Sequence, residues 1–206
     1  MVGNNKRKRH RTRREKTDRQ LQTVLARQWR SPMGSDSYTP RMMTSPTYGK
    51  VSVARMCQLI AKFIMGSPHD RYVIGIGTDS QNFDYTKVVS AVYVHRVGYG
   101  AMVFYDVTRI PKVSNIHKKM LMETGDSIAL ADEVVGLLVS IDMPDGTTFR
   151  IDRYDVSVEL HCDVGKGGRS CETIREVVGW VESCGYVCRI KPYSPAASSL
   201  ANKISK

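Results

Sequence analysis

The chain has 206 residues, with 31 Lys and Arg, 20 Asp and Glu, five Cys and 41% hydrophobic residues. This length suits one compact domain with its own core, plus a tail. No apolar run approaches the roughly 18 residues of a membrane span, and no apolar stretch follows the basic start as in a secretory signal. Five Cys without a C-x-x-C pair argue against a disulfide framework or a zinc ribbon. Composition therefore predicts a cytoplasmic protein, or a nuclear one if the source is eukaryotic.

The positive charge is concentrated at the N-terminus. Residues 1–30 hold eleven Lys and Arg and two acidic residues, so they carry +9 of the net charge of +11. Such a self-repelling segment is expected to form a disordered arm that binds nucleic acid, because each phosphate it neutralises releases counterions. A solubilising tail and a nuclear-import address are the alternatives. The candidate nucleic-acid-binding residues of the arm are Lys6, Arg7, Lys8, Arg9, Arg11, Arg13 and Arg14.

A linker and then a helix follow the arm. Residues 31–49 are rich in Ser, Pro, Thr, Met and Gly, which predicts a linker before a domain that spans residues 50–206. Apolar residues recur at helical spacing from Val53 to Ile64, and Gly66 marks the end of that helix.

Three strands come next. Tyr72 to Thr78 is an apolar run that predicts a strand ending at Asp79. Residues 87–97 and 101–108 are rich in β-branched and aromatic side chains, and the Gly-Tyr-Gly turn between them predicts a hairpin.

Helices and strands alternate in the second half of the chain. A long helix is expected to begin near Ser114, and a strand follows at 156–164. A helix capped by Ser170, a short strand at 186–190 and a final helix at 195–204 complete the order. The sequence therefore predicts an α/β fold with a mixed sheet: three antiparallel strands, then two parallel strands, with helices on both faces.

Carboxylates follow two of these strands. Asp79 and Asp163 should meet at one edge of the sheet, and Glu123 on the intervening helix can lean over it. Two carboxylates about 4 Å apart repel by about 4 kcal/mol at an effective dielectric of about 20, so such a cluster needs a proton or a cation. Oxygen ligands without histidine suit Mg²⁺ or Mn²⁺, which can activate water for phosphodiester cleavage. The alternative is that these residues are ordinary turn and surface acids.

Other polar residues lie near the predicted edge. The loop around Lys166 and Arg169 lacks the pattern of a nucleotide-binding P-loop, but these two residues and Lys191 are candidates to hold a nucleic-acid phosphate. Glu159 and His161 share a face with Asp163 and either support the site or simply hydrogen-bond within the strand. For all of these residues, a purely structural or solvated role remains open.

Five segments carry a family resemblance. They are SPTYG at 45–49, IGTDSQ at 76–81, METGDSIALA at 122–131, HCDVGKGG at 161–168 and IKPYSPAASSLANK at 190–203. Together they resemble the bacterial YkuK family over roughly residues 44–206, and the basic arm lies outside the match.

The resemblance implies an RNase H-like fold and a metal-dependent nuclease. Asp79, Glu123 and Asp163 would be catalytic residues and ligands of Mg²⁺ or Mn²⁺. Enzymes of this fold usually carry a fourth acid on the last helix, where this chain has Asn202. An asparagine can ligate a metal through its carbonyl oxygen but brings no charge.

Two functions follow as hypotheses. The first is hydrolysis of phosphodiester bonds in RNA, DNA or an RNA–DNA hybrid, with RNA favoured as partner. The second is a non-catalytic nucleic-acid-binding or ribonucleoprotein module, which Asn202 and the basic arm favour. A weaker third reading, an actin- or hexokinase-type ATPase, starts from Gly75 to Asp79 but would need a second domain. No membrane contact is expected, and the sequence does not indicate an oligomeric state.

Overall fold

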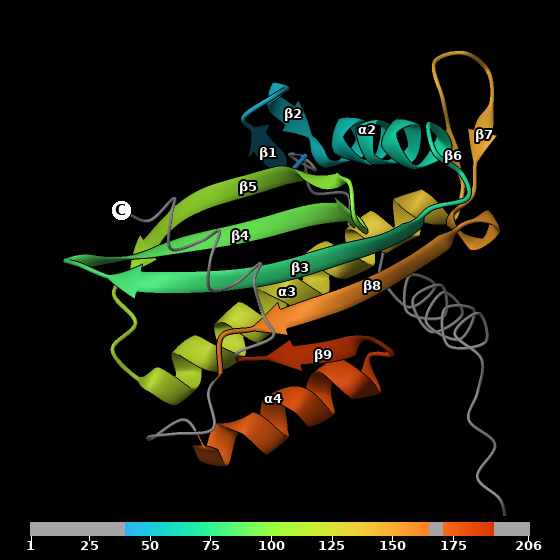
Figure 1. Cartoon of the computed structure of the whole chain (residues 1–206). Helices are drawn as coiled ribbons and strands as arrows, with labels where there is room; N and C mark the ends of the chain where they lie inside the picture. The colour runs from blue at the N-terminus through green and yellow to red at the C-terminus, as the bar shows by residue number, and fades with distance from the viewer. Residues whose placement is uncertain (1–39, 165–170, 192–206) are drawn as a thin grey trace, which may run out of the picture.

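A seven-stranded mixed sheet forms the centre of the computed structural model, which describes residues 40–164 and 171–191 (Figure 1). The strand order is β2-β1-β5-β4-β3-β8-β9. In this order, each strand from β2 to β3 pairs antiparallel with its neighbour, whereas β8 runs parallel to β3 and β9 parallel to β8. This arrangement confirms the expected α/β sheet. The strands are β1 (Met42–Ser45), β2 (Gly49–Ser52), β3 (Arg71–Asn82), β4 (Tyr85–Arg96), β5 (Gly100–Pro111), β8 (Asp155–Cys162) and β9 (Val187–Ile190).

Three described helices pack on one face of this sheet: α2 (Val53–Met65), α3 (Ile116–Val139) and α4 (Cys171–Ser183). Strand alternation places Tyr72, Ile74, Ile76, Thr78 and Ser80 of β3 on that face. Tyr72 donates to a carbonyl oxygen at the end of α2, and Thr78 and Ser80 donate to side chains of α3. The helix expected at 195–204 lies outside the described residues.

Helix α3 begins close to the predicted position. Asn115 caps it by accepting a hydrogen bond from the Lys118 backbone N–H, one residue after the expected Ser114. Gly125 lies inside the helix, where a Cβ atom would come within 3.1 Å of the Trp180 ring. The glycine that weakens the helical pattern therefore gives room for close packing between α3 and α4.

A small hairpin and a short turn connect α3 to β8. The hairpin strands are β6 (Ile141–Asp142) and β7 (Thr148–Phe149), and Gly146 adopts a positive φ of 82° in the predicted turn between them. The 3₁₀ turn η1 (Ile151–Arg153) follows. Within the described ranges, the structure contains no helix that is both long and apolar enough to cross a membrane.

The linker prediction is wrong at its C-terminal end, because β1 and part of β2 fall within residues 31–49. Ser45, Pro46 and Thr47 belong to a tight hairpin, in which Gly49 has a φ of 67°. Met43 is fully buried in the core, and the Tyr48 ring stacks on Phe104 at 6.3 Å. The folded unit therefore begins before residue 50.

Strand β3 also extends beyond its predicted end at Asp79. It pairs with β4 as far as Asn82 opposite Thr86, whereas its pairing with β8 stops at Thr78 opposite Cys162. Asp79 is therefore the first residue of β3 that has β4 on one side and no paired strand on the other.

Candidate active site

Asp79 and Asp163 lie at matching positions on neighbouring strands. Each is the first residue beyond the last pair in the β3–β8 register. Because β3 and β8 are parallel, both residues lie at the same end of the sheet. Burial raises the pKa of Asp79, and the nearby charge of Asp163 raises it further, although the carboxylate accepts a hydrogen bond from the Ser80 backbone N–H at 2.8 Å.

Glu123 reaches the same end of the sheet from α3. It is buried, and its Oε1 accepts a hydrogen bond of 2.6 Å from the Ser80 hydroxyl. Burial raises the pKa of Glu123 to about 7, and the charges of Asp79 and Asp163 act in the same direction. Glu123 also lines a small recess together with Thr78, Thr124, Ser127, Cys162 and Asp163.

The buried stripe of α3 becomes polar where it faces this end of the sheet. Glu123, Thr124 and Ser127 are buried there, whereas the later part of the helix buries aliphatic residues. Thr124 and Ser127 donate to carbonyl oxygens one turn earlier in the helix, at 2.8 and 2.9 Å. The hydroxyl groups of Thr124 and Ser127 thus have hydrogen-bond partners within α3, and the Glu123 carboxylate does not.

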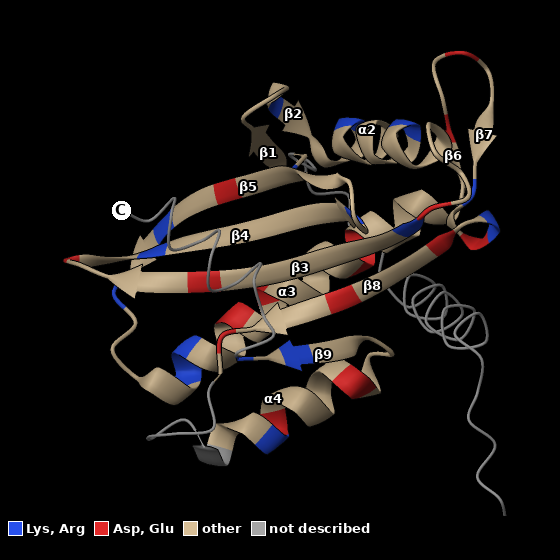
Figure 2. Cartoon of the chain, viewed as in Figure 1, with Lys and Arg blue, Asp and Glu red and all other residues tan. Residues whose placement is uncertain are grey.

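Two lysines face the carboxylates. Lys119 Nζ lies 3.9 Å from Glu123 Oε1, one helical turn away, and donates to the Ser80 carbonyl oxygen. Lys191 Nζ lies 2.6 Å from Asp163 Oδ1. Figure 2 shows the basic and acidic residues of α3 close together on its first turns. Lysine ammonium groups therefore supply positive charge to two of the three acids.

The donor set suits a hard divalent cation. It consists of carboxylate oxygens, which Mg²⁺ and Mn²⁺ prefer, and the raised pKa of Asp79 reflects both burial and a neighbouring negative charge that a cation would relieve. In the ranges 40–164 and 171–191, however, no three His, Cys, Asp or Glu side chains are grouped closely enough to hold a metal ion. Joint coordination would thus require side-chain movement, including release of Asp163 from Lys191.

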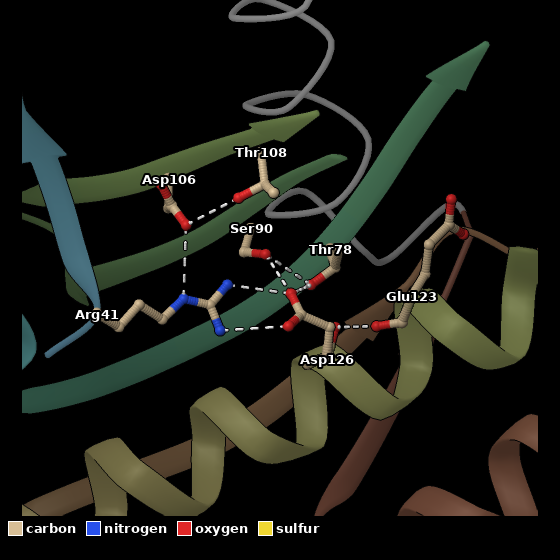
Figure 3. A network of polar contacts seen from close by, with 8 residues as sticks. Arg41, Thr78, Ser90, Asp106, Thr108, Glu123 and Asp126 are labelled. Carbon is tan, nitrogen blue, oxygen red and sulfur yellow. Dashed lines mark hydrogen bonds and ion pairs between the residues drawn. The ribbon is translucent and has the colours of Figure 1, made fainter. Parts of the chain in front are cut away.

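Asp126, one turn after Glu123, is a central residue that the sequence analysis missed (Figure 3). Its carboxylate accepts hydrogen bonds from the Arg41 guanidinium at 3.0 and 3.3 Å, from Thr78 at 3.2 Å and from Ser90 at 2.5 Å. Arg41 Nε also lies 3.7 Å from Asp106 of β5. Burial opposes ionisation of Asp126, but the bonds from Arg41 and Ser90 outweigh it and lower the pKa of this carboxyl.

This network fixes α3 against the sheet. Thr78 and Ser90 are opposite each other on β3 and β4, so Asp126 bonds to both strands at once. The i, i+3 spacing of Glu123 and Asp126 was visible in the sequence and places both on one side of the helix. Arg41 was not a foreseeable partner, because it falls in the predicted linker.

Comparison with known proteins agrees with the fold. The sequence model of the ribonuclease H-like family, described as "Ribonuclease H-like", matches residues 55–206. The "Uncharacterized protein YkuK" of Bacillus subtilis (strain 168) is 34% identical over 150 residues, which cover 70% of this chain and 85% of that protein. The chain belongs to the YkuK family of ribonuclease H-like proteins. No solved structure matches it at a comparable level of significance.

In this YkuK-family chain, Glu159 and His161 lie on the sheet face opposite α3. Arg189 of β9 donates to both carboxylate oxygens of Glu159, at 2.9 and 2.8 Å, and His161 Nε2 lies 3.8 Å away. The nearby His161 ring and the hydrogen bonds from Arg189 lower the pKa of Glu159 to about 2. The buried His161 ring packs edge-on against Tyr93 at 5.4 Å. These contacts agree with the alternative in which Glu159 and His161 have a structural role within the sheet.

The remaining candidate residues divide into two groups. Lys191 is described and paired with Asp163. Lys166, Arg169, Asn202 and the seven basic residues of the arm lie outside the described residues, so the fourth ligand position stays a prediction.

Proposed function

We propose that this YkuK-family protein is a metal-dependent nuclease that hydrolyses phosphodiester bonds in nucleic acid, with RNA as the favoured substrate. One observation carries the proposal. Asp79, Glu123 and Asp163 come from β3, α3 and the end of β8, and they lie near enough for their charges to affect one another. The ribonuclease H-like family supports the same class of chemistry.

The proposed site would bind Mg²⁺ or Mn²⁺ through Asp79 and Asp163, with Glu123 beside them and Asn202 as a further candidate ligand. When bound, the metal would supply Lewis-acid activation of water and of the scissile phosphate. Glu123 is poised between its protonated and ionised forms near neutral pH, because its pKa is about 7. The ammonium groups of Lys119 and Lys191, once released from the carboxylates, would contact phosphate oxygens.

Substitution of Asp79 tests the proposal. We expect Asp79→Asn to abolish Mn²⁺-dependent cleavage of labelled RNA, because it removes a negative charge from the metal site while keeping the side-chain shape. Asp155→Asn, at an exposed position at the far end of β8, should cleave at the wild-type rate. Cleavage by Asp79→Asn at the wild-type rate would reject the assignment.

A non-catalytic nucleic-acid-binding module is the second candidate function. The lysine contacts favour it, because Lys119 and Lys191 already supply positive charge to Glu123 and Asp163. Asn202 favours it as well, because it brings no charge to the position of a fourth acid. Purified protein that binds RNA tightly in Mn²⁺ yet leaves RNA, DNA and hybrid uncut would support this function over the nuclease.

A further inference from the structure

The hairpin tip that joins β3 to β4 carries an aromatic pair, the exposed Phe83 and the half-buried Tyr85. Phe83 is 43% exposed, and its ring centroid lies 5.6 Å from that of Tyr85, with the planes tilted by 33°. The Arg109 guanidinium of β5 lies 5.0 Å from the centre of the Tyr85 ring. The Phe83 N–H donates to the Tyr85 carbonyl oxygen at 2.7 Å and closes the turn. Aromatic and cationic groups are thus presented together on one hairpin.

Strand register places further groups on the same face. Gln81 is opposite Lys87, which is opposite Arg109, so these three form a row across β3, β4 and β5. Asp79 lies two residues before Gln81 and therefore faces the same side, away from α3. In the adjacent row, Val107 is 39% exposed. The exposed part of this face is therefore partly apolar, and it ends at Val89, which lies between Asp79 and Val107 and is only 1% exposed.

The charge of the hairpin tip and of the neighbouring end of β5 is complementary to phosphate. Arg109 and the exposed Lys112 outnumber Asp84, the acidic residue of the turn. Figure 2 shows basic residues on β4 and β5 beside the tip. Exposed aromatic rings beside cations suit unpaired nucleotides, because bases stack on the rings while the cations follow the backbone. A duplex keeps its bases stacked inside and cannot use the rings in this way.

The opposite end of the sheet provides a contrast. Tyr99, in the β4–β5 turn, is 72% exposed, and the Arg96 guanidinium lies 4.3 Å from its ring centre. Arg96 is already ion-paired with Asp70 at 2.5 Å, and this turn is at the far end of β4 from Val89, the partner of Asp79. The Tyr99 pair is therefore a matched control for the aromatic tip.

We infer that the hairpin tip formed by Phe83 and Tyr85, together with Arg109 and Lys112 beside it, is a platform for single-stranded nucleic acid. Bases stack on the two aromatic rings, and the lysine and arginine neutralise the phosphates. Phe83 follows the end of β3, four residues along the chain from Asp79, so it lies at most about 14 Å from that residue. The platform therefore delivers an unpaired strand toward the carboxylates, a part of the inference that rests on the proposed nuclease function.

Binding measurements on the full chain test the platform. Fluorescence anisotropy in EDTA, which prevents metal-dependent cleavage, would compare a short oligo(U) RNA, an oligo(dT) DNA and the matching duplexes. We expect Phe83→Ala to weaken single-strand binding by about tenfold and duplex binding by much less. Arg109→Gln should lower the slope of log affinity against log salt by about one. Tyr99→Ala should bind like the wild type, and equal far-ultraviolet circular dichroism would verify that every variant is folded.

The outcomes separate this inference from the nuclease proposal. Unchanged single-strand affinity in Phe83→Ala, or an equal loss with duplex or in Tyr99→Ala, would overturn the platform. A loss of affinity for single strands but not for duplexes supports the platform. Whether oligo(U) alone or both oligo(U) and oligo(dT) lose affinity then shows whether the platform prefers RNA. A protein that binds through Phe83 but cleaves nothing keeps the platform and rejects the nuclease. If cleavage depends on Asp79 but binding does not change in Phe83→Ala or Arg109→Gln, the nuclease proposal is kept and the platform is rejected.

Discussion

Lys191 Nζ lies 2.6 Å from Asp163 Oδ1, so a side chain from the end of β9 neutralises the acid that follows β8. A divalent cation at the proposed site must compete with this ammonium group. The contact is also partly solvent-exposed, since nearly half of the Lys191 side chain is accessible, and water weakens such pairs.

Removal of this competitor should strengthen metal binding. We expect Lys191→Gln to lower the Kd for Mn²⁺ by roughly 3- to 10-fold, or about 1 kcal/mol, in isothermal titration calorimetry. Lys62→Gln, at an exposed position on α2, should leave the Kd unchanged. Weaker Mn²⁺ binding in Lys191→Gln would mean that the lysine supports the site rather than blocking it.

The pH dependence of metal binding should follow Glu123. Its pKa is raised from the usual carboxyl range to about 7, so the carboxylate is mostly protonated below that pH and ionised above it. Only the ionised form attracts a cation, so Mn²⁺ affinity should increase as the pH rises through about 7. The Ser80 hydrogen bond favours the ionised form, and its loss must raise the pKa further.

Ser80→Ala therefore provides a directional test. We expect the midpoint of Mn²⁺ affinity against pH to move roughly one pH unit higher, because a hydrogen bond to a charged group stabilises it by about 1.5–3 kcal/mol before solvent screening. Ser67→Ala, at the end of α2, is the control. A midpoint that stays in place or moves lower would contradict the role of the Ser80 hydroxyl.

The Asp126 network should contribute to stability. Asp126→Asn removes the charge that pairs with Arg41, and we expect the free energy of unfolding in urea to fall by about 2 kcal/mol near neutral pH. Because the pKa of Asp126 is lowered in the folded state, its stabilisation is present above the unfolded pKa and is lost as the pH falls through the folded value.

An exposed local pair provides the control for this effect. Arg150 and Asp152 lie 3.2 Å apart on the surface near η1, and Asp152→Asn should change stability by less than about 0.5 kcal/mol. A double-mutant cycle with Arg41→Met would measure the coupling between Arg41 and Asp126 directly. If the two losses simply add, the residues do not stabilise the fold through each other.

Gly75 should be essential for packing on the face away from the helices. A Cβ atom at this position would lie 2.0 Å from the Tyr93 ring, and that ring is packed against His161. We expect Gly75→Ala to reduce the unfolding free energy by about 2–3 kcal/mol, and Tyr93→Leu to rescue much of the loss. Thermal and urea unfolding would measure both effects.

A second glycine provides the matched control. Gly179 lies inside α4, and a Cβ there would meet nothing within 4 Å. Gly179→Ala should therefore stabilise the protein by about 0.5–1 kcal/mol through helix propensity. If Gly75→Ala is also neutral or stabilising, the Tyr93 ring must be able to move away.

Periodicity in the sequence was sufficient to predict the main helices and strands from α2 to β9, and which of these strands pair antiparallel and which parallel. Alternating and helical patterns reported local structure, and handedness rules then fixed how β8 follows β3. The N-terminal hairpin was missed because its turn residues dominate its composition, while only Met43 signals burial. The end of β3 was missed because its length depends on pairing with β4, which no local pattern reports.

The same limit applies to the candidate site. Asp79, Glu123 and Asp163 could be assigned from strand ends and a family resemblance, because each lies in a recognisable motif. The partners of these acids could not, because Lys119, Lys191 and Ser80 became neighbours only through tertiary packing. The Arg41–Asp126 contact spans 85 residues along the chain and has no local signal at all.

Residues 164 and 191, on either side of α4 and β9 in the sequence, lie next to each other beside Asp163. The Lys191 N–H donates to the Val164 carbonyl oxygen at 3.2 Å, just beyond the last β8–β9 pair, Cys162 opposite Ile190. The two ends of the segment 165–190 are thus joined by this hydrogen bond. Insertions or deletions within the segment can alter the neighbouring surface while the hydrogen bond keeps Asp163 in position. Relatives in which this segment differs in length could acquire new specificities while the three acids stay unchanged.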